Sequence, residues 1–377
     1  MSCGKCWRGP CRNQTMPDHS SAQTLIDLVG IPSPTGAEHA ASRWLVGRML
    51  ELGFTEASID ESGNAVGRMG DGPNQAILLG HIDTVPGVIP VRLDGDLLYG
   101  RGTVDAKGPL AAFVDAVAGL GRVEGWSFVV VGAVDEEGDS RGARHLLTQG
   151  YRPRFAIVGE PSRWDRITIG YKGSAWTTVT VRRPLAHSAA AEPTACEAAL
   201  AAWSSIQAWA EAFNHGRDRL FDRVVPSLQR WSSDDDGLQA WARIHLGARL
   251  PPDIEPQRWM ETLQTITEGA VVDWAGLATP AYRGEKNTPL TRAFLRAIRD
   301  GGGQPAFVTK TGTADLNLVA PAWSCPAVAY GPGDSSLDHT AREHISLAEY
   351  ARSVVVLGAT LRDLTRPPSQ LFGESLA

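Results

Sequence analysis

The chain contains short apolar runs, each of which is followed by a loop of polar or acidic residues. Ala76–Leu79 precedes GHIDTVPG, Ser127–Val134 precedes DEEGD, and Phe155–Val158 precedes GEPS. Helices are expected between these runs, at residues 109–120 and 142–148. The repeated order of apolar strand, polar loop and helix predicts an α/β domain with a largely parallel sheet. Ligands bind such sheets at the carboxyl ends of the strands, so the polar loops are expected to form one site.

A different pattern begins after Gly170. A strand that alternates like a half-exposed one is followed by a long helix, an acidic loop (SSDDDG), a strand, a helix and a closing strand. This order predicts a separate α+β domain, and from residue 280 onward the first pattern resumes. The second domain is therefore expected to be inserted into the first. The expected division is a loose extension at 1–16, a catalytic domain at 17–171 and 280–377, and an inserted domain at 172–279.

The composition excludes several classes of protein. With 43% hydrophobic and 21% charged residues, the chain is typical of a globular protein, and no apolar run approaches the roughly 20 residues of a membrane span. The net charge is −6 with both signs mixed along the chain, which argues against nucleic-acid and membrane-surface binding. The basic N-terminus lacks the apolar core of a secretory signal, so we expect a cytoplasmic protein.

Three of the five cysteines lie at the N-terminus, as Cys3, Cys6 and Cys11. The first two have a zinc-site spacing, but a closed zinc site needs four ligands and the nearest candidate for the fourth is His19. We therefore interpret residues 1–16 as a loose tail, with Met16 as a natural start. The small number of cysteines is typical of a reducing compartment.

Metal-binding residue types occur in five of the loop segments. His81 and Asp83 lie two apart on an extended segment, so both could bind a metal, or Asp83 could orient the far nitrogen of His81. Glu136 and Glu137 are adjacent, so one can face a metal while the other faces the substrate. Imidazole and carboxylate ligands without cysteine suit zinc, cobalt or manganese, and two ions that share a carboxylate can activate water and polarise a carbonyl. The segments contain His81-Ile82-Asp83, Asp105, Glu136-Glu137, Glu160 and His339.

The motifs GHIDTVPG, GRGTVDAKG, DEEG, VGEPS and GPGD…DHT…E resemble, in this order, those of the M20 family of di-zinc amidohydrolases and peptidases. The resemblance extends over about residues 20–365. It implies a zinc-peptidase-like catalytic domain interrupted by a ferredoxin-like lid and dimerisation domain. It also implies two zinc ions, with cobalt as a substitute. Matched position by position, one zinc would be held by His81, Asp105 and Glu160, and the other by Asp105, Glu137 and His339.

The resemblance also implies roles around these ligands. Glu136 would be the general base, which takes a proton from the attacking water and later passes it to the leaving amine. Asp83 would orient His81. His344 competes with His339 for the last ligand position, but HT-x-x-E matches the family at His339, with Glu343 in its usual place.

The lid region is similar to that of the family as well, through GYKGSAW…AHSAA…P. In the family the histidine of this motif, here His187, reaches across a dimer to stabilise the oxyanion. A homodimer is therefore expected. One departure concerns the family's NvIP-like stretch, where this chain reads RWSSDDDGLQAWARIHL, so a second lid contact is not assigned.

The substrate segments resemble a narrower branch of the family through TKTGTADLN and GPGDSSLDHT. Enzymes of this branch release lysine or ornithine from the glutamyl end of a small acidic amino-group carrier protein in lysine and arginine biosynthesis. Arg283 or Lys310 could pair with the product carboxylate and Asp315 or Asp338 with its ammonium, and Asn317 belongs to the same segment.

Other functions stay open at this point. The main alternative is an N-acyl-amino-acid deacylase, such as acetylornithine deacetylase or succinyl-diaminopimelate desuccinylase, or a carboxypeptidase. A non-catalytic metal-binding scaffold is the third. The net charge of −6 provides no overall attraction for an acidic partner, which weighs against the carrier hypothesis, although the net charge does not reveal a local arginine patch near the cleft.

Overall fold

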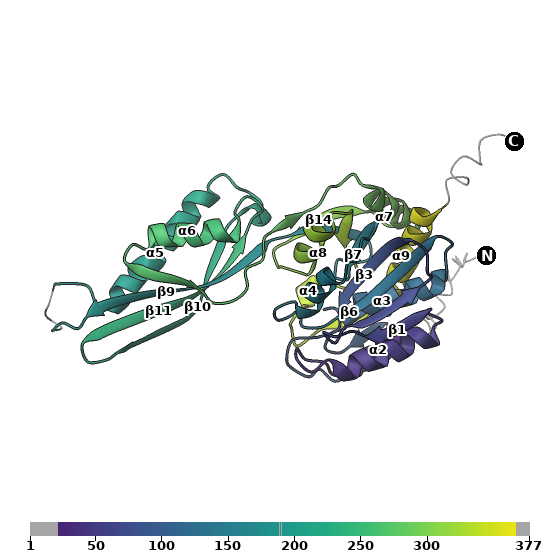
Figure 1. Ribbon diagram of the computed structural model, residues 1–377, viewed down its shortest axis with the longest axis horizontal. Coiled ribbons are helices and arrows are strands. Elements are labelled where there is room, and N and C mark those ends of the chain that lie inside the picture. Colours follow the sequence, from purple (N-terminus) through teal and green to yellow (C-terminus); the bar gives the residue numbers. More distant parts are fainter. Residues whose placement is uncertain (1–21, 188, 190, 367–377) are drawn as a thin grey trace, which may run out of the picture.

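The computed structural model describes residues 22–187, 189 and 191–366, which form two lobes joined by a narrow connection (Figure 1). The larger lobe contains a nine-stranded sheet and the smaller lobe a four-stranded sheet. The chain enters the smaller sheet at β9 (Gly173–Pro184) and leaves it after β12 (Ala270–Trp274). An α+β unit is thus inserted into an α/β unit, as the sequence predicts. The extension at 1–16, with its three cysteines, lies outside the described residues.

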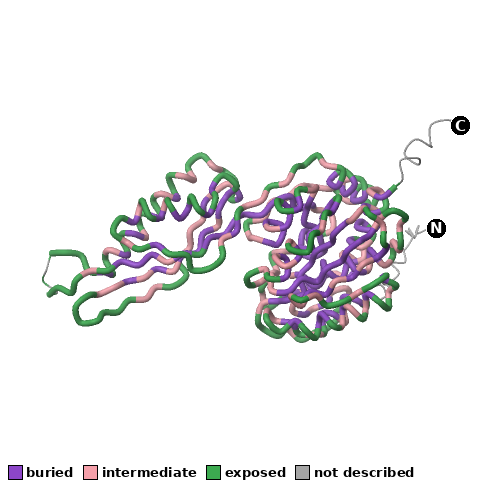
Figure 2. Tube along the Cα trace, in the orientation of Figure 1, coloured by how far each residue is buried: buried purple, intermediate pink, exposed green. Residues whose placement is uncertain are grey.

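Parallel strands form the centre of the larger sheet. β3 (Asn74–His81) pairs in parallel with β6 (Trp126–Ala133) and with β7 (Phe155–Val158), and β7 pairs in parallel with β15 (Ala327–Ala329). Almost every side chain of these strands is buried, because helices cover both faces of the sheet. Figure 2 shows the buried positions along these central strands.

Alternate residues of the central strands contact different helices. Leu78 of β3 belongs to one core with α3 (Lys107–Leu120) and α9 (Leu347–Thr365). Its neighbours Ile77 and Leu79 belong to a second core on the opposite face. The helices of that face are α4 (Arg141–Thr148) and α8 (Leu316–Trp323).

Antiparallel strands, which the sequence did not predict, flank this parallel centre. The sheet order is β1-β2-β6-β3-β7-β15-β8-β13, with β14 paired to β8 in parallel. The sheet is therefore mixed; of its unpredicted strands, β1 is largely exposed and β13 has two residues, whereas β8 is almost entirely buried. The remaining elements of this lobe are α1 (Gln23–Val29), α2 (His39–Glu51), β1 (Glu56–Ile59), β2 (Ala65–Met69), β4 (Arg92–Asp94), β5 (Leu97–Tyr99), β8 (Arg166–Tyr171), β13 (Tyr282–Arg283), α7 (Pro289–Asp300), β14 (Ala306–Lys310) and β16 (His344–Ser346).

The smaller lobe, called the lid below, has the ferredoxin-like order strand–helix–strand–strand–helix–strand. Its antiparallel sheet has the order β10 (Val225–Asp235), β11 (Gln239–Leu250), β9 and β12. α5 (Ala195–Asn214) and α6 (Pro256–Ile266) pack against one face of this sheet (Figure 1). A capping box formed by Thr194 and Glu197 fixes the start of α5.

One prediction for the lid was wrong. The acidic segment expected as a loop is the end of β10 (Val225–Asp235), where Asp234 and Asp235 pair with the start of β11 (Gln239–Leu250). The hairpin turn lies at residues 236–238. These carboxylates are exposed at the tip of the hairpin and keep their hydration, so strand pairing prevails over their poor strand propensity.

No helix in the described ranges combines the length and the apolar composition that a bilayer span requires.

Candidate active site

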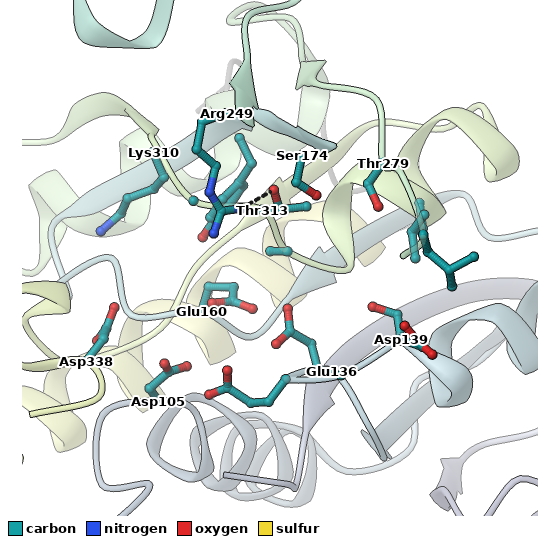
Figure 3. Close-up of a pocket in the computed structure, with 18 of the residues that line it drawn as sticks. Asp105, Glu136, Asp139, Glu160, Ser174, Arg249, Thr279, Lys310, Thr313 and Asp338 are labelled. Carbon is teal, nitrogen blue, oxygen red and sulfur yellow. Dashed lines mark hydrogen bonds between the residues drawn. The ribbon is translucent and has the colours of Figure 1, made fainter. Parts of the chain in front are cut away.

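The predicted ligands converge where the central strands end. His81 is the last residue of β3, while Glu136 and Glu160 follow β6 and β7. Because these strands are parallel neighbours, their carboxyl ends meet at one edge of the sheet. Figure 3 shows Asp105, Glu136 and Glu160 around a common space.

Two groups of potential metal ligands share Asp105. The ligand atoms of His81, Asp105 and Glu160 lie within 4.8 Å of one another, as do those of Asp105, Glu137 and His339. Asp105 Oδ1 lies 3.2 Å from His81 Nε2, and Asp105 Oδ2 lies 3.0 Å from His339 Nε2. Each carboxylate oxygen therefore faces a different imidazole, as a bridging ligand must. These imidazole and carboxylate donors fit a pair of divalent ions such as zinc, cobalt or manganese.

Asp83 lies behind these groups. Its buried carboxylate accepts hydrogen bonds from the backbone nitrogens of Glu136 and Glu137, both at 3.1 Å, and from Thr35 Oγ1 at 2.9 Å. His81 Nδ1 lies 3.0 Å from the backbone oxygen of Asp83 and 3.5 Å from its Oδ1, on the far side of the ring from Asp105. Asp83 is thus placed to orient His81 and the Glu136–Glu137 backbone, and this geometry favours orientation over metal binding.

Glu343 anchors the loop that carries Asp105. Its buried carboxylate accepts hydrogen bonds from the backbone nitrogens of Val104 at 2.9 Å and Asp105 at 3.1 Å. Arg101 Nη1 pairs with the same carboxylate at 2.9 Å. The sequence marked Glu343 only as part of a motif, because its partners are more than 200 residues away along the chain.

His344 does not join the ligand groups. It lies in β16, where its ring packs against Tyr99 with 4.9 Å between centroids, and its Nδ1 lies 2.7 Å from the Arg342 carbonyl oxygen. His339 instead lies 2.9 Å from Glu137 Oε1. The structure thus places His339, the preferred candidate, beside Asp105.

The concentration of acidic groups shifts their proton affinities. Burial raises the pKa of Glu136 well above its ordinary value. The positive charge of His81 lowers this pKa in part, and the negative charge of Glu160 raises it again. Burial likewise raises the pKa of Glu160. Hydrogen bonds to Asp105 and Glu137 raise the pKa of His339 to about 10. Cations are therefore the natural partners of this set of carboxylates.

A cavity of about 520 Å³ lies above the ligands, between the larger lobe and the lid. The lid contributes Ser174, Trp176 and Arg249 to its wall. In Figure 3, Arg249 enters from the lid side opposite Glu136 and the other carboxylates. Its Nη1 donates to Thr313 Oγ1 at 2.7 Å. Arg249 was not predicted as a site residue, because the only local signal in the sequence is a basic residue at the end of the alternating lid strand WARIHLGARL.

The predicted substrate residues have different surroundings. Lys310 lines the cavity together with Asp338, and its Nζ donates to Ser335 Oγ. Arg283 is not among the lining residues. It lies 3.7 Å from Asp222 and over the ring of Phe221.

The other two substrate candidates are buried at α8. Asp315 precedes this helix, and neither it nor Asn317 is among the lining residues. The Asn317 amide donates to the carbonyl oxygens of Pro280 at 2.8 Å and Lys172 at 3.2 Å, and its oxygen accepts from the Ala314 nitrogen at 3.1 Å. Asn317 thus joins the two segments that connect the lid to the larger lobe, which is a structural position.

His187 lies apart from the cavity of its own chain. It belongs to the exposed segment after β9, and its Nδ1 accepts a hydrogen bond from the Ala189 nitrogen at 3.2 Å. It is not among the lining residues. The role predicted for His187 therefore requires a second chain, and it stays a prediction.

Residues 77–363 match Peptidase family M20/M25/M40, a span that contains all the ligand candidates. The chain belongs to this family. Among its M20 relatives, the "[LysW]-lysine hydrolase" of Deinococcus radiodurans is 44% identical over 359 residues, which cover 92% of this chain and 98% of that protein. The "Putative [LysW]-lysine/[LysW]-ornithine hydrolase" of Pyrococcus abyssi is 40% identical, with coverage of 93% and 95%.

Solved structures of peptidases share the fold. Aminopeptidase PepT from Bacillus cereus superposes with a TM-score of 0.76 at 17% identity, and the match covers 93% of this chain and 100% of that chain. The YXEP protein of Bacillus subtilis, described as a dinuclear metal binding peptidase from the M20 family, gives a TM-score of 0.67 at 16% identity. That match covers 91% of this chain and 97% of YXEP. At these identities the likeness concerns the fold.

Proposed function

We propose that this M20 hydrolase cleaves the amide that links lysine, ornithine or both to the glutamyl end of an acidic amino-group carrier protein. The observation that carries the proposal is the pair of ligand groups centred on Asp105, with Glu136 beside them in the cavity wall. The 44% identity to a protein named "[LysW]-lysine hydrolase" supports this choice of substrate. The same proposal places the enzyme in the cytoplasm.

The proposed enzyme binds two zinc ions, for which cobalt can substitute. His81, Asp105 and Glu160 would hold one ion, and Asp105, Glu137 and His339 the other. When bound, the ions would supply a water of lowered pKa and polarise the scissile carbonyl.

Glu136 moves the proton in this proposal. Its carboxylate takes a proton from the water whose oxygen attacks the carbonyl carbon. It then gives that proton to the nitrogen of the scissile amide as the carbon–nitrogen bond breaks, and the free α-amine leaves. Asp83 keeps the Glu136 backbone in place through the hydrogen bond to its nitrogen.

The cavity wall offers partners for both charged ends of lysine. Arg249 or Lys310 would pair with the carboxylate of the amino acid, and Asp338 with its side-chain ammonium. We no longer assign Arg283, Asp315 and Asn317 to this task, because they do not line the cavity. In a homodimer, His187 of a second subunit would donate a hydrogen bond to the developing oxyanion.

A direct assay tests the function. The zinc-loaded enzyme is given the lysine-linked and the ornithine-linked carrier and, separately, N-acetylornithine, and release of the free amino acid is measured. We expect a higher kcat/KM for a carrier-linked substrate. A higher kcat/KM for N-acetylornithine would overturn the proposal and favour a deacylase.

A further inference from the structure

One face of the lid sheet is not covered by helices. α5 and α6 pack on one side, where Ile244 and Leu246 of β11 are buried in the lid core. Because side chains alternate along a strand, the intervening residues of β11 lie on the opposite, open face. From Trp241 to Arg249 this row spans about 26 Å, at about 3.3 Å per residue. Its members are Trp241, Arg243, His245, Gly247 and Arg249.

The neighbouring strands add two more arginines to this face. Arg182 of β9 lies opposite Trp241, and Arg230 of β10 lies opposite His245, with 3.0 Å between Arg230 Nη2 and His245 Nε2. The Arg243 guanidinium lies 5.4 Å from the centroid of the Trp241 ring. We define the cationic face as the four arginines Arg182, Arg230, Arg243 and Arg249, with His245 between them.

The cationic face forms no salt bridge with the described part of the chain, although the Asp236 carboxylate of the hairpin turn lies near Arg182. Among the described residues, none of its four arginines has a carboxylate oxygen within 4.0 Å. Three of them instead have neutral neighbours, namely His245, Thr180 and Thr313. The same face carries the carboxylates Asp234 and Asp273. Basic charge therefore prevails here on a chain whose net charge is −6.

The cationic face continues into the cavity. Arg249 belongs to both, and Trp176 lines the cavity while packing over Gly247. A Cβ at position 247 would lie 2.7 Å from Trp176 Cζ3, so glycine is needed for this contact. A ligand whose reactive end occupies the cavity can therefore extend along the open face.

We propose that the cationic face binds an acidic segment of the carrier protein while its glutamyl-linked lysine occupies the cavity. The proposal rests on the proposed function and adds the surface that recognises the partner. Arginine guanidinium groups bind carboxylates in paired hydrogen bonds, and a local positive field accelerates the approach of an acidic protein. The segment contacts the middle of the face, between the cavity and the acidic hairpin tip at Asp234.

The test reverses charge where the catalytic machinery is not touched. Arg230→Glu and Arg243→Glu, in the middle of the face, are combined, and Arg258→Glu on the exposed side of α6 serves as the control within the same lobe. The substrates are the lysine-linked carrier and a glutamyl-lysine dipeptide with the same scissile amide. For the double variant we expect KM for the carrier to rise roughly tenfold at low salt, with kcat unchanged. Added salt should reduce the difference, and the dipeptide and the control should behave as wild type.

Other results would contradict the proposal in distinguishable ways. If the kinetics with the carrier are unchanged in the double variant, the cationic face does not bind the carrier, and the proposed function still stands. An equal loss with both substrates would mean that the face acts on the site itself. A change in oligomeric state by light scattering would assign the face to a second copy of the chain. Absence of carrier hydrolysis by the wild type would instead refute the proposed function.

Discussion

The two lobes hold their functional side chains in different ways. In the larger lobe, buried carboxylates fix the backbone of the site residues. Asp83 accepts hydrogen bonds from the backbone nitrogens of Glu136 and Glu137, and Glu343 accepts one from that of Asp105. In the lid, Arg249 has a single hydroxyl partner in the larger lobe, and His187 lies in an exposed segment. The larger lobe therefore holds its catalytic and ligand side chains in place without the lid. Whether the lid residues reach the site depends on the position of the lid relative to the larger lobe.

The largest effect is expected from Glu136→Gln in the larger lobe. The amide cannot carry the proton from water to the leaving amine, so kcat should fall by about 10²–10⁴. Zinc content by mass spectrometry should not change, because Glu136 is outside both ligand groups. The exposed Glu124→Gln serves as a control. Retained turnover in the Glu136 variant would contradict the assigned mechanism.

The lid offers the second largest effect, through His187→Ala. Loss of an oxyanion donor should lower kcat by about 10²–10³ with little change in KM. If His187 acts across a dimer, mixing this variant with Glu136→Gln creates mixed dimers with one intact site. Activity should then recover to about a quarter of wild type.

A matched control makes the mixing experiment decisive. His187→Ala mixed with the double variant His187→Ala/Glu136→Gln should not recover, because no intact site can form. Equal activity in the two mixtures would show that His187 does not act between subunits. The lid would then contribute to catalysis only within its own chain.

Glu343→Gln tests whether the hydrogen bonds of Glu343 to the backbone of Val104 and Asp105 position Asp105 for metal binding. The neutral amide holds the Val104 and Asp105 nitrogens less strongly and leaves Arg101 without its charge partner, so zinc affinity should fall by about 10–100-fold. Calorimetric zinc titration measures the change. Asp96→Asn is the control, because Asp96 also accepts a backbone hydrogen bond, from Ala348, but touches no ligand. Equal affinities in the two variants would remove the special role of Glu343.

The smallest effect concerns pH. Hydrogen bonds to Asp105 and Glu137 raise the pKa of His339 to about 10, so in the metal-free enzyme the imidazole is protonated at neutral pH. A metal requires neutral imidazole and displaces this proton. Zinc affinity should therefore rise with pH below about 10, by about tenfold per unit for each displaced proton. Calorimetry in buffers of different ionisation enthalpy counts the protons, and a pH-independent affinity would contradict the assignment.

The central strands and the ligand candidates could be predicted because their signals are local. An apolar run such as Phe155–Val158 indicates a buried strand, and the polar residue after it then lies at a known edge. The short edge strands lack such runs and form through pairing with distant partners. Arg249 was missed for the same reason, since its place in the cavity depends on how the lid sheet lies over the larger lobe.

Membership in a motif predicted the cavity-lining residues less well than a position at the end of a central strand did. Asp315 and Asn317 stand in a segment that touches the cavity, but the start of α8 buries both side chains. Which side chains of a loop face a cavity depends on the hydrogen bonds of its backbone. Here the Asn317 amide binds carbonyl oxygens of the segments that lead into the lid. A sequence does not show these partners.

The central claim is that Asp105 bridges two metal ions. Crystals of the zinc-loaded enzyme, measured with X-rays on both sides of the zinc absorption edge, test it most directly. We predict two anomalous peaks per chain, one enclosed by His81, Asp105 and Glu160 and the other by Asp105, Glu137 and His339. A single peak, or a peak without Asp105 among its ligands, would contradict the account.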